Sequence, residues 1–129
     1  MKTRLILLSL AMLNPFGLFD YLASFKYEVR GGCVAYSLER FIAEKGGSCK
    51  DFAYFTGKVL KVIGYDPKIL VIKIGEDTYH AVTVFQYDGK HSGIYKFDGR
   101  ALYGPYKNYD LIVKNRPYRE IGIRRDMCQ

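Results

Sequence analysis

The most regular segment of the chain lies between residues 49 and 64. Apolar or small side chains recur there at spacings of three and four, at Phe52, Ala53, Thr56, Val59, Leu60 and Ile63. This spacing predicts an amphipathic helix, for which Ser48 is the N-cap and Gly64 marks the end. Cys49 therefore falls in the first turn, on the face that the helix turns toward the core.

Downstream of this helix the pattern changes to that of strands. The predicted strands are residues 69–74, 79–87, 93–98, 111–113 and 118–123. The first is apolar along most of its length, as in a strand buried on both faces, and the second is rich in β-branched and aromatic residues. Asp88-Gly89 predicts a hairpin turn between the second and third strands. Tyrosines and Gly104-Pro105 predict a loop after the third.

Two shorter helices are expected upstream. Asn14 is a plausible cap for a helix through Leu22, and Ser37 for one through Ile42. Residues 25–29, between them, have an extended pattern. Helices followed by an antiparallel sheet predict an α+β fold.

Length limits the architecture. A chain of 129 residues can bury one core, so we expect a single domain over residues 14–129. Residues 1–13 are an apolar N-terminal segment that is either the first helix of the domain or a short signal-like sequence. The protein is accordingly cytoplasmic or exported, depending on that segment, which is too short to span a bilayer.

The charge of the chain limits its partners. A net charge of +7 suits an acidic partner such as nucleic acid. Apart from Arg124-Arg125, however, the basic residues are scattered singly among acids, which favours an ordinary solvated surface. The sequence leaves the oligomeric state open.

The three cysteines leave at least one thiol free. Cys33 and Cys128 could pair if the protein is exported, and Cys49 would then be the free one. There is no CxxC motif, and the two histidines, His80 and His91, are too few for a convincing metal site. No metal or organic cofactor is expected.

Cys49, His80 and Asp98 form the candidate catalytic set. If the hairpin turn is centred on Gly89, His80 and Asp98 are direct cross-strand neighbours with Cβ atoms roughly 4.5–5.5 Å apart. Taken singly, each residue is explained by plain packing or turn formation. A cysteine at a helix start, a strand histidine and a matching aspartate together favour a thiol nucleophile with its base and orienting group.

The expected chemistry follows from these positions. The helix N-terminus and an adjacent imidazolium lower the pKa of a thiol, so that Cys49 can attack a carbonyl carbon as a thiolate. His80 then protonates the leaving group. The backbone N–H of Cys49 is a candidate oxyanion donor, and Tyr27 and Tyr36 are candidates for a second.

These motifs resemble those of the transglutaminase-like superfamily, in particular its bacterial cysteine protease type. The run Gly47-Ser48-Cys49 opening a helix, the strand start His80-Ala81-Val82 and the following Asp98 match its pattern. The resemblance covers roughly residues 14–104. It implies a papain-like core in which N-terminal helices, including the nucleophile helix, pack on an antiparallel sheet.

The resemblance also implies a function. We expect a thiol-dependent amide hydrolase or acyltransferase that acts on peptide or protein amides through an acyl-cysteine intermediate. The alternative is a non-catalytic binding module on the same fold, recruiting a peptide or nucleic acid through a basic surface rich in tyrosine, of which the chain has 12.

Overall fold

The computed structural model describes residues 14–88 and 92–128. The N-terminal segment, the Gly89 turn and His91 therefore lie outside the described residues. The helices are α2 (Pro15–Leu22), α3 (Leu38–Glu44), α4 (Cys49–Val62) and α5 (Tyr109–Val113). The strands are β1 (Lys26–Tyr27), β2 (Gly46–Gly47), β3 (Lys68–Lys73), β4 (Tyr79–Tyr87), β5 (Gly93–Asp98), β6 (Ala101–Tyr106) and β7 (Tyr118–Ile121).

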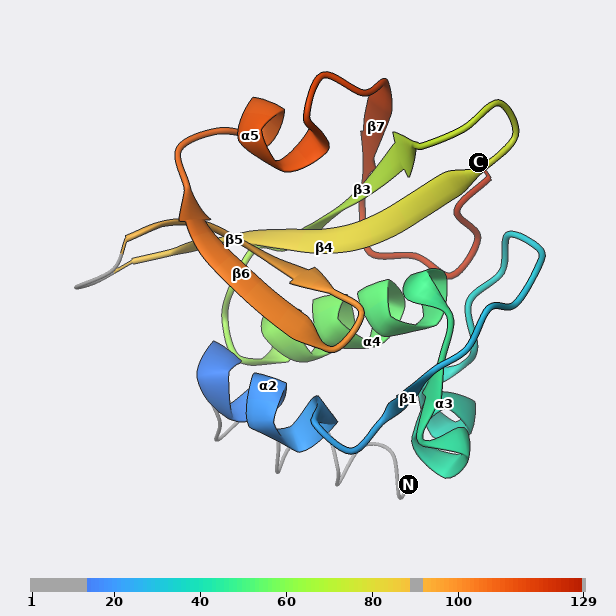
Figure 1. The fold of residues 1–129 in the computed structure, drawn as a ribbon. Coiled ribbons are helices and arrows are strands. Elements are labelled where there is room, and N and C mark those ends of the chain that lie inside the picture. The colour runs from blue at the N-terminus through green and yellow to red at the C-terminus, as the bar shows by residue number, and fades with distance from the viewer. Residues whose placement is uncertain (1–13, 89–91, 129) are drawn as a thin grey trace.

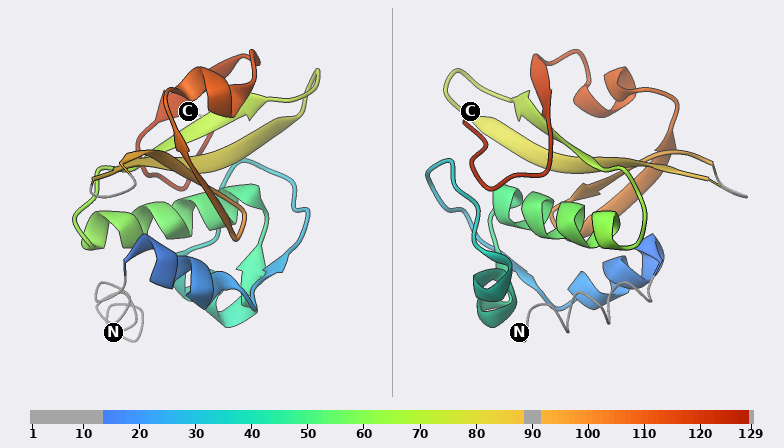
Figure 2. Two further views of the ribbon diagram at one scale, coloured as in Figure 1. Left: turned by 60° about the vertical axis from the view of Figure 1, so that its left-hand side comes forward. Right: turned by 180° about the vertical axis from the view of Figure 1, so that it is seen from behind.

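Five strands form one antiparallel sheet in the order β6-β5-β4-β3-β7. Helix α4 lies along one face of this sheet and α5 covers part of the other (Figure 1). Helix α2 lies on the side of α4 that faces away from the sheet, as the views in Figure 2 also show. The predicted α+β fold, with the cysteine helix packed on an antiparallel sheet, is confirmed.

The main core holds α4 in place on the sheet. It consists of fully or nearly fully buried side chains from α4, α2 and the central strands, including Phe52, Phe55, Leu60, Leu18, Leu22, Phe85 and Phe97. Each large side chain of this kind stabilises the fold by about 1.5–3 kcal/mol through burial. The start of α4 is thereby fixed relative to the start of β4.

A polar contact pins α4 to β4 inside this apolar interface. The buried hydroxyl of Thr83 donates to the carbonyl oxygen of Ala53 at 2.7 Å, and the Thr56 hydroxyl lies 3.0 Å from that of Thr83. A hydrogen bond in a buried setting is costly to break, because the groups it leaves behind cannot reach water. The contact therefore fixes the register of the helix along the strand.

The predicted helix caps are also confirmed. The side chain of Asn14 accepts from the N–H of Gly17, and that of Ser37 from the N–H of Arg40. Ser48 is the N-cap of α4 in an extended conformation. Within residues 14–88 and 92–128 no helix is long and apolar enough to cross a bilayer.

Two local predictions are wrong. Residues 111–113 belong to helix α5, because the Asn108 side chain caps the N–H of Leu111 and the segment packs Ile112 and Val113 on the sheet. The predicted loop after Gly99 is the edge strand β6. A proline is tolerated on an edge strand, where its missing N–H breaks no ladder.

Candidate active site

Cys49 is the first residue of α4, and the N-cap Ser48 separates it from the short strand β2. Strand β2 pairs in parallel with β1, so that Tyr27 lies opposite Gly47, and the N–H of Glu28 donates to the Gly47 carbonyl at 2.8 Å. The positive φ of Gly46, +148°, lets the chain turn from α3 into this pairing. The Cys49 thiol is therefore at a helix N-terminus, and Tyr27 lies on β1, the strand that pairs with β2.

His80 and Asp98 meet, although not in the predicted register. A turn centred on Gly89 predicts Thr83 opposite Tyr95, whereas Thr83 pairs with Phe97. Likewise Tyr87 pairs with Gly93, whereas the predicted register would pair it with the residue at position 91. His80 and Asp98 are therefore not direct cross-strand neighbours.

The two side chains still share a face, because a shift of two residues preserves the alternation of a strand. They meet along the diagonal, which long side chains can span. His80 Nε2 lies 2.6 Å from Asp98 Oδ1. His80 also hydrogen bonds with the side chain of Cys49, so the structure brings all three predicted site residues together.

The electrostatics of the group favour a charged pair. Burial raises the pKa of the Cys49 thiol, but hydrogen bonds from His80 and from the N–H of Ala81 outweigh it, and the pKa of Cys49 falls below its usual value. Hydrogen bonds to Asp98 and Cys49 raise the pKa of His80 to about 9. Near neutral pH these shifts favour a thiolate beside an imidazolium.

A fourth charged residue, Lys96, contacts the carboxylate. Its ammonium lies 3.7 Å from Asp98 Oδ2, the oxygen that does not face His80, and lies over the rings of Tyr103 and Tyr106. Burial raises the pKa of Asp98, while His80 and then Lys96 lower it, with a net shift downward. Asp98 is therefore held ionised and in one orientation.

The two tyrosines suggested as second oxyanion donors differ in position. Burial and the neighbouring Cys49 raise the pKa of Tyr27 to about 12, and its hydroxyl hydrogen bonds with both the thiol and the backbone N–H of Cys49. Tyr36 is held elsewhere, with its ring between the guanidinium groups of Arg30 and Arg40. Only Tyr27 of this pair contacts the thiol.

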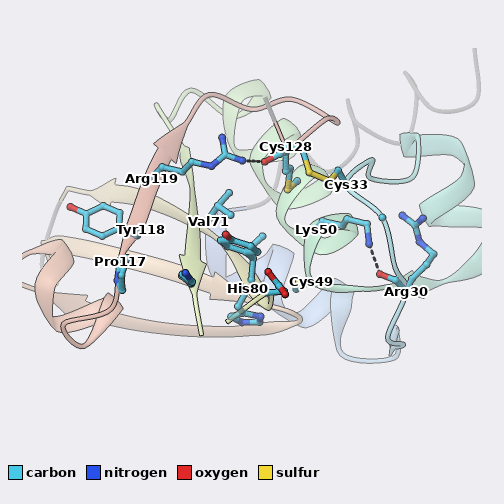
Figure 3. A pocket seen from close by; sticks show the side chains of 16 residues that line it. Arg30, Cys33, Cys49, Lys50, Val71, His80, Pro117, Tyr118, Arg119 and Cys128 are labelled. Carbon is cyan, nitrogen blue, oxygen red and sulfur yellow. Dashed lines mark hydrogen bonds between the residues drawn. A yellow bond between two sulfur atoms is a disulfide. The ribbon is translucent and has the colours of Figure 1, made fainter. Parts of the chain in front are cut away.

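Cys49 and His80 line a cleft of about 740 Å³ (Figure 3). A disulfide between Cys33 and Cys128, whose Cα atoms are 5.5 Å apart, forms part of the cleft wall. All three cysteines lie among the described residues, and Cys49 is the free one. The pairing that the sequence left open is thus present.

A family model for transglutaminase-like domains matches residues 14–121. The chain belongs to this family. The match begins at the cap of α2 and ends at the last residue of β7, so it includes the whole sheet and the Cys49, His80 and Asp98 positions. Among curated proteins, no relative matches the chain.

In this transglutaminase-like domain the start of α4 is tied to the loop between β1 and α3 by a hydrogen-bond network that sequence reasoning missed. The Asp51 carboxylate, 1% exposed, accepts from Arg30, from the Ser48 N–H at 2.7 Å and from the Tyr36 N–H at 2.6 Å. Burial raises the pKa of Asp51, but these hydrogen bonds lower it by more, so the pKa falls below its usual value. Ser48 and Asp51 have the spacing of a capping box, which was the available sequence signal.

The position of Asp51 in the first turn of a helix indicates only a general electrostatic stabilisation of that helix, and nothing in the sequence indicates Arg30 as its partner. The Arg30–Asp51 pair holds the loop between β1 and α3 against the start of α4. Among residues 14–88 and 92–128, no three His, Cys, Asp or Glu side chains come together to hold a metal ion.

Proposed function

We propose that the protein is a thiol-dependent amide hydrolase or acyltransferase with Cys49 as nucleophile, His80 as acid and base, and Asp98 as orienting group. The observation that carries the proposal is the contact chain itself. Cys49, at the N-terminus of a buried helix, hydrogen bonds with His80, which lies 2.6 Å from Asp98. Membership of the transglutaminase-like family supports cysteine-based catalysis on this fold.

The proposed reaction has two halves. The Cys49 thiolate attacks the carbonyl carbon of an amide and forms a C–S bond, and the carbonyl electrons move to the oxygen. Collapse of this intermediate breaks the C–N bond, and the His80 imidazolium gives its proton to the departing amine. Water or a second amine, deprotonated by His80, then attacks the acyl-Cys49 carbonyl and releases the thiolate.

The developing oxyanion needs hydrogen-bond donors. We assign the backbone N–H of Cys49 and the hydroxyl of Tyr27 to this role, since the hydroxyl already hydrogen bonds with Cys49. With a pKa of about 12, Tyr27 stays protonated at neutral pH and can donate. Loss of one such donor typically costs about 10²–10³-fold in rate.

The test follows the acyl-enzyme with p-nitrophenyl acetate as the acyl donor and intact-protein mass spectrometry as the readout. We expect one acetyl group on Cys49, none on the Cys49→Ala variant, and roughly 10²–10⁴-fold slower acylation of the His80→Ala variant. Adding a small primary amine distinguishes transfer from hydrolysis, because only a transferase yields the acetylated amine as the main product. Equal acylation of the wild type and Cys49→Ala would refute the assignment.

A binding module with an inactive triad is the competing function. It predicts no acyl-enzyme, together with a salt-dependent interaction with a peptide or nucleic acid that Cys49→Ala leaves unchanged. The polarised Cys49–His80 contact favours catalysis, because simple binding does not require a thiol with a lowered pKa.

A further inference from the structure

The cleft beside Cys49 has an unequal charge distribution. Among its described lining residues, the cations are Arg30, Lys50, Lys73 and Arg119, and the acid is Asp77. Figure 3 shows Arg119 and Lys50 on either side of the Cys33–Cys128 disulfide, with Cys49 and His80 below them. The cleft wall is therefore positively charged near the nucleophile.

The cations differ in how far their charge is balanced. Arg30 forms an ion pair with Asp51 at 2.5 Å, so its charge is compensated. Lys50 is buried, with 7% of its surface exposed, yet its ammonium contacts two neutral oxygens, the Arg30 carbonyl at 2.6 Å and the Ser48 hydroxyl at 3.1 Å. Lys73 ends strand β3 with an exposed side chain. Within the described residues, neither Lys50 nor Lys73 forms an ion pair with a carboxylate.

Asp51 stabilises the Lys50 ammonium only through space, and a buried ammonium with no carboxylate in contact is costly unless a ligand or substrate supplies the anion. Lys50 directly follows Cys49 in the chain, and the N-terminal end of the 14-residue helix α4 adds its positive potential at the same place. The apolar side chains of Val71, Ala81 and Met127 line the same cleft. The site is thus built for a ligand that is both apolar and anionic.

We propose that the cleft selects acyl donors with carboxylate side chains beside the reacting amide, that is, acidic peptide segments. This inference rests on the proposed function, because the substrate is defined relative to acyl transfer at Cys49. A peptide fits better than a nucleic acid, since it supplies the amide carbonyl that a thiolate attacks, whereas a phosphodiester backbone has none.

The charge of the cleft can be measured without a substrate. Iodoacetate and iodoacetamide alkylate a thiolate by the same displacement of iodide, and they differ by one negative charge. The ratio of their rates at Cys49 is independent of changes in thiol pKa, because both reagents meet the same thiolate. Without reductant the disulfide persists, so each reagent reports on Cys49.

We expect Lys73→Gln to lower the iodoacetate-to-iodoacetamide ratio roughly threefold to fivefold at low salt, and Lys73→Glu to lower it further. Lys73→Arg should restore the ratio of the wild type. Lys61→Gln is the matched control, because Lys61 is exposed on the last turn of α4, about 18 Å along the helix from Cys49, and at that distance through water the loss of one charge should change the ratio less than about twofold even at low salt. A ratio that is the same in all four variants overturns the proposal.

A second arm tests the ligand class. Hexaglutamate should protect Cys49 from iodoacetamide in a salt-dependent manner, and hexaglutamine should not. Equal protection by a thymidine hexanucleotide, or none by hexaglutamate, overturns the acidic-peptide assignment. Failure of the proposed function is seen separately, as a Cys49 thiol that iodoacetamide labels no faster than an ordinary thiol, whatever the ratio of the two reagents.

Discussion

Replacing Asp98 by Asn isolates the charge that orients His80. The amide oxygen of Asn can still accept from the imidazole N–H at the 2.6 Å contact, so the geometry is kept while the negative charge is lost. Because the carboxylate favours the protonated ring, its removal should lower the pKa of His80. Thiolate and imidazolium coexist at pH values up to the pKa of His80. The upper pH limit of this range should therefore fall.

The size of the effect follows from the raised pKa. A pKa of about 9 against an ordinary value of 6.5 corresponds to about 3.4 kcal/mol in favour of the imidazolium. The hydrogen bond to Asp98 is the largest contribution, but the His80 and Asp98 side chains are 25% and 30% exposed, so solvent screens part of it. We expect Asp98→Asn to lower the pKa of His80 by about 1–2 units.

The assay is an NMR titration of the His80 ring nitrogens. It is carried out in a Cys49→Ala background, with and without Asp98→Asn, so that the thiolate does not contribute to the difference. Asp20→Asn, which removes an exposed charge on α2, is the control and should leave the His80 pKa unchanged. If the pKa of His80 in the Asp98→Asn protein stays within a few tenths of its parent, Asp98 does not act through its charge.

Three further changes test the surroundings of the site. Asp51→Ala leaves a buried cluster without its anion and should lower the free energy of unfolding by about 3 kcal/mol or more in urea titrations; a loss below about 1 kcal/mol would contradict this role. Gly46→Ala places a methyl group against the carbonyl oxygen of Lys26 and should cost about 2 kcal/mol. Gly31→Ala, which meets nothing within 4 Å, should stay within about 0.5 kcal/mol in the same titration. Lys96→Met removes a cation 3.7 Å from the candidate carboxylate and should raise the imidazole pKa in the NMR titration, opposite in sign to Asp98→Asn.

Sequence reasoning succeeds where local signals and burial agree. The bounds of β4 and β5 match the predicted 79–87 and 93–98, because β-branched and aromatic residues fill both strands and turn residues flank them. Helix α4 combines a strong period with a cap at Ser48. The candidate triad could be proposed because its members sit at the start of these well-marked elements or at their end.

The wrong local predictions share a cause, because contacts with other elements of the fold decide the structure of these segments. Leu111-Ile112-Val113 has β-branched character, but the Asn108 cap and packing against the sheet select a helix. The hairpin register depended on a turn length that two residues, Asp88 and Gly89, could not fix. His80 and Asp98 still share a face of the sheet only because the predicted and observed registers differ by two residues, an even number.

Long-range contacts were beyond sequence reasoning altogether. The cleft wall needs Cys33 and Cys128, which are 95 residues apart in the chain. The Arg30–Asp51 pair joins a loop to a helix start across 21 residues. Nothing in the local pattern of either partner indicates the other, because such pairs are selected by the folded geometry.

The pH dependence of Cys49 alkylation by iodoacetamide, compared between the wild type and His80→Ala, tests whether His80 stabilises the Cys49 thiolate. If His80 activates Cys49, the wild-type rate should reach half its maximum below the ordinary thiol pKa of about 8.5. In His80→Ala the midpoint should rise above that value, because burial of the thiol is then less opposed. A wild-type profile centred near 8.5 and unmoved by His80→Ala would contradict a thiolate activated by His80.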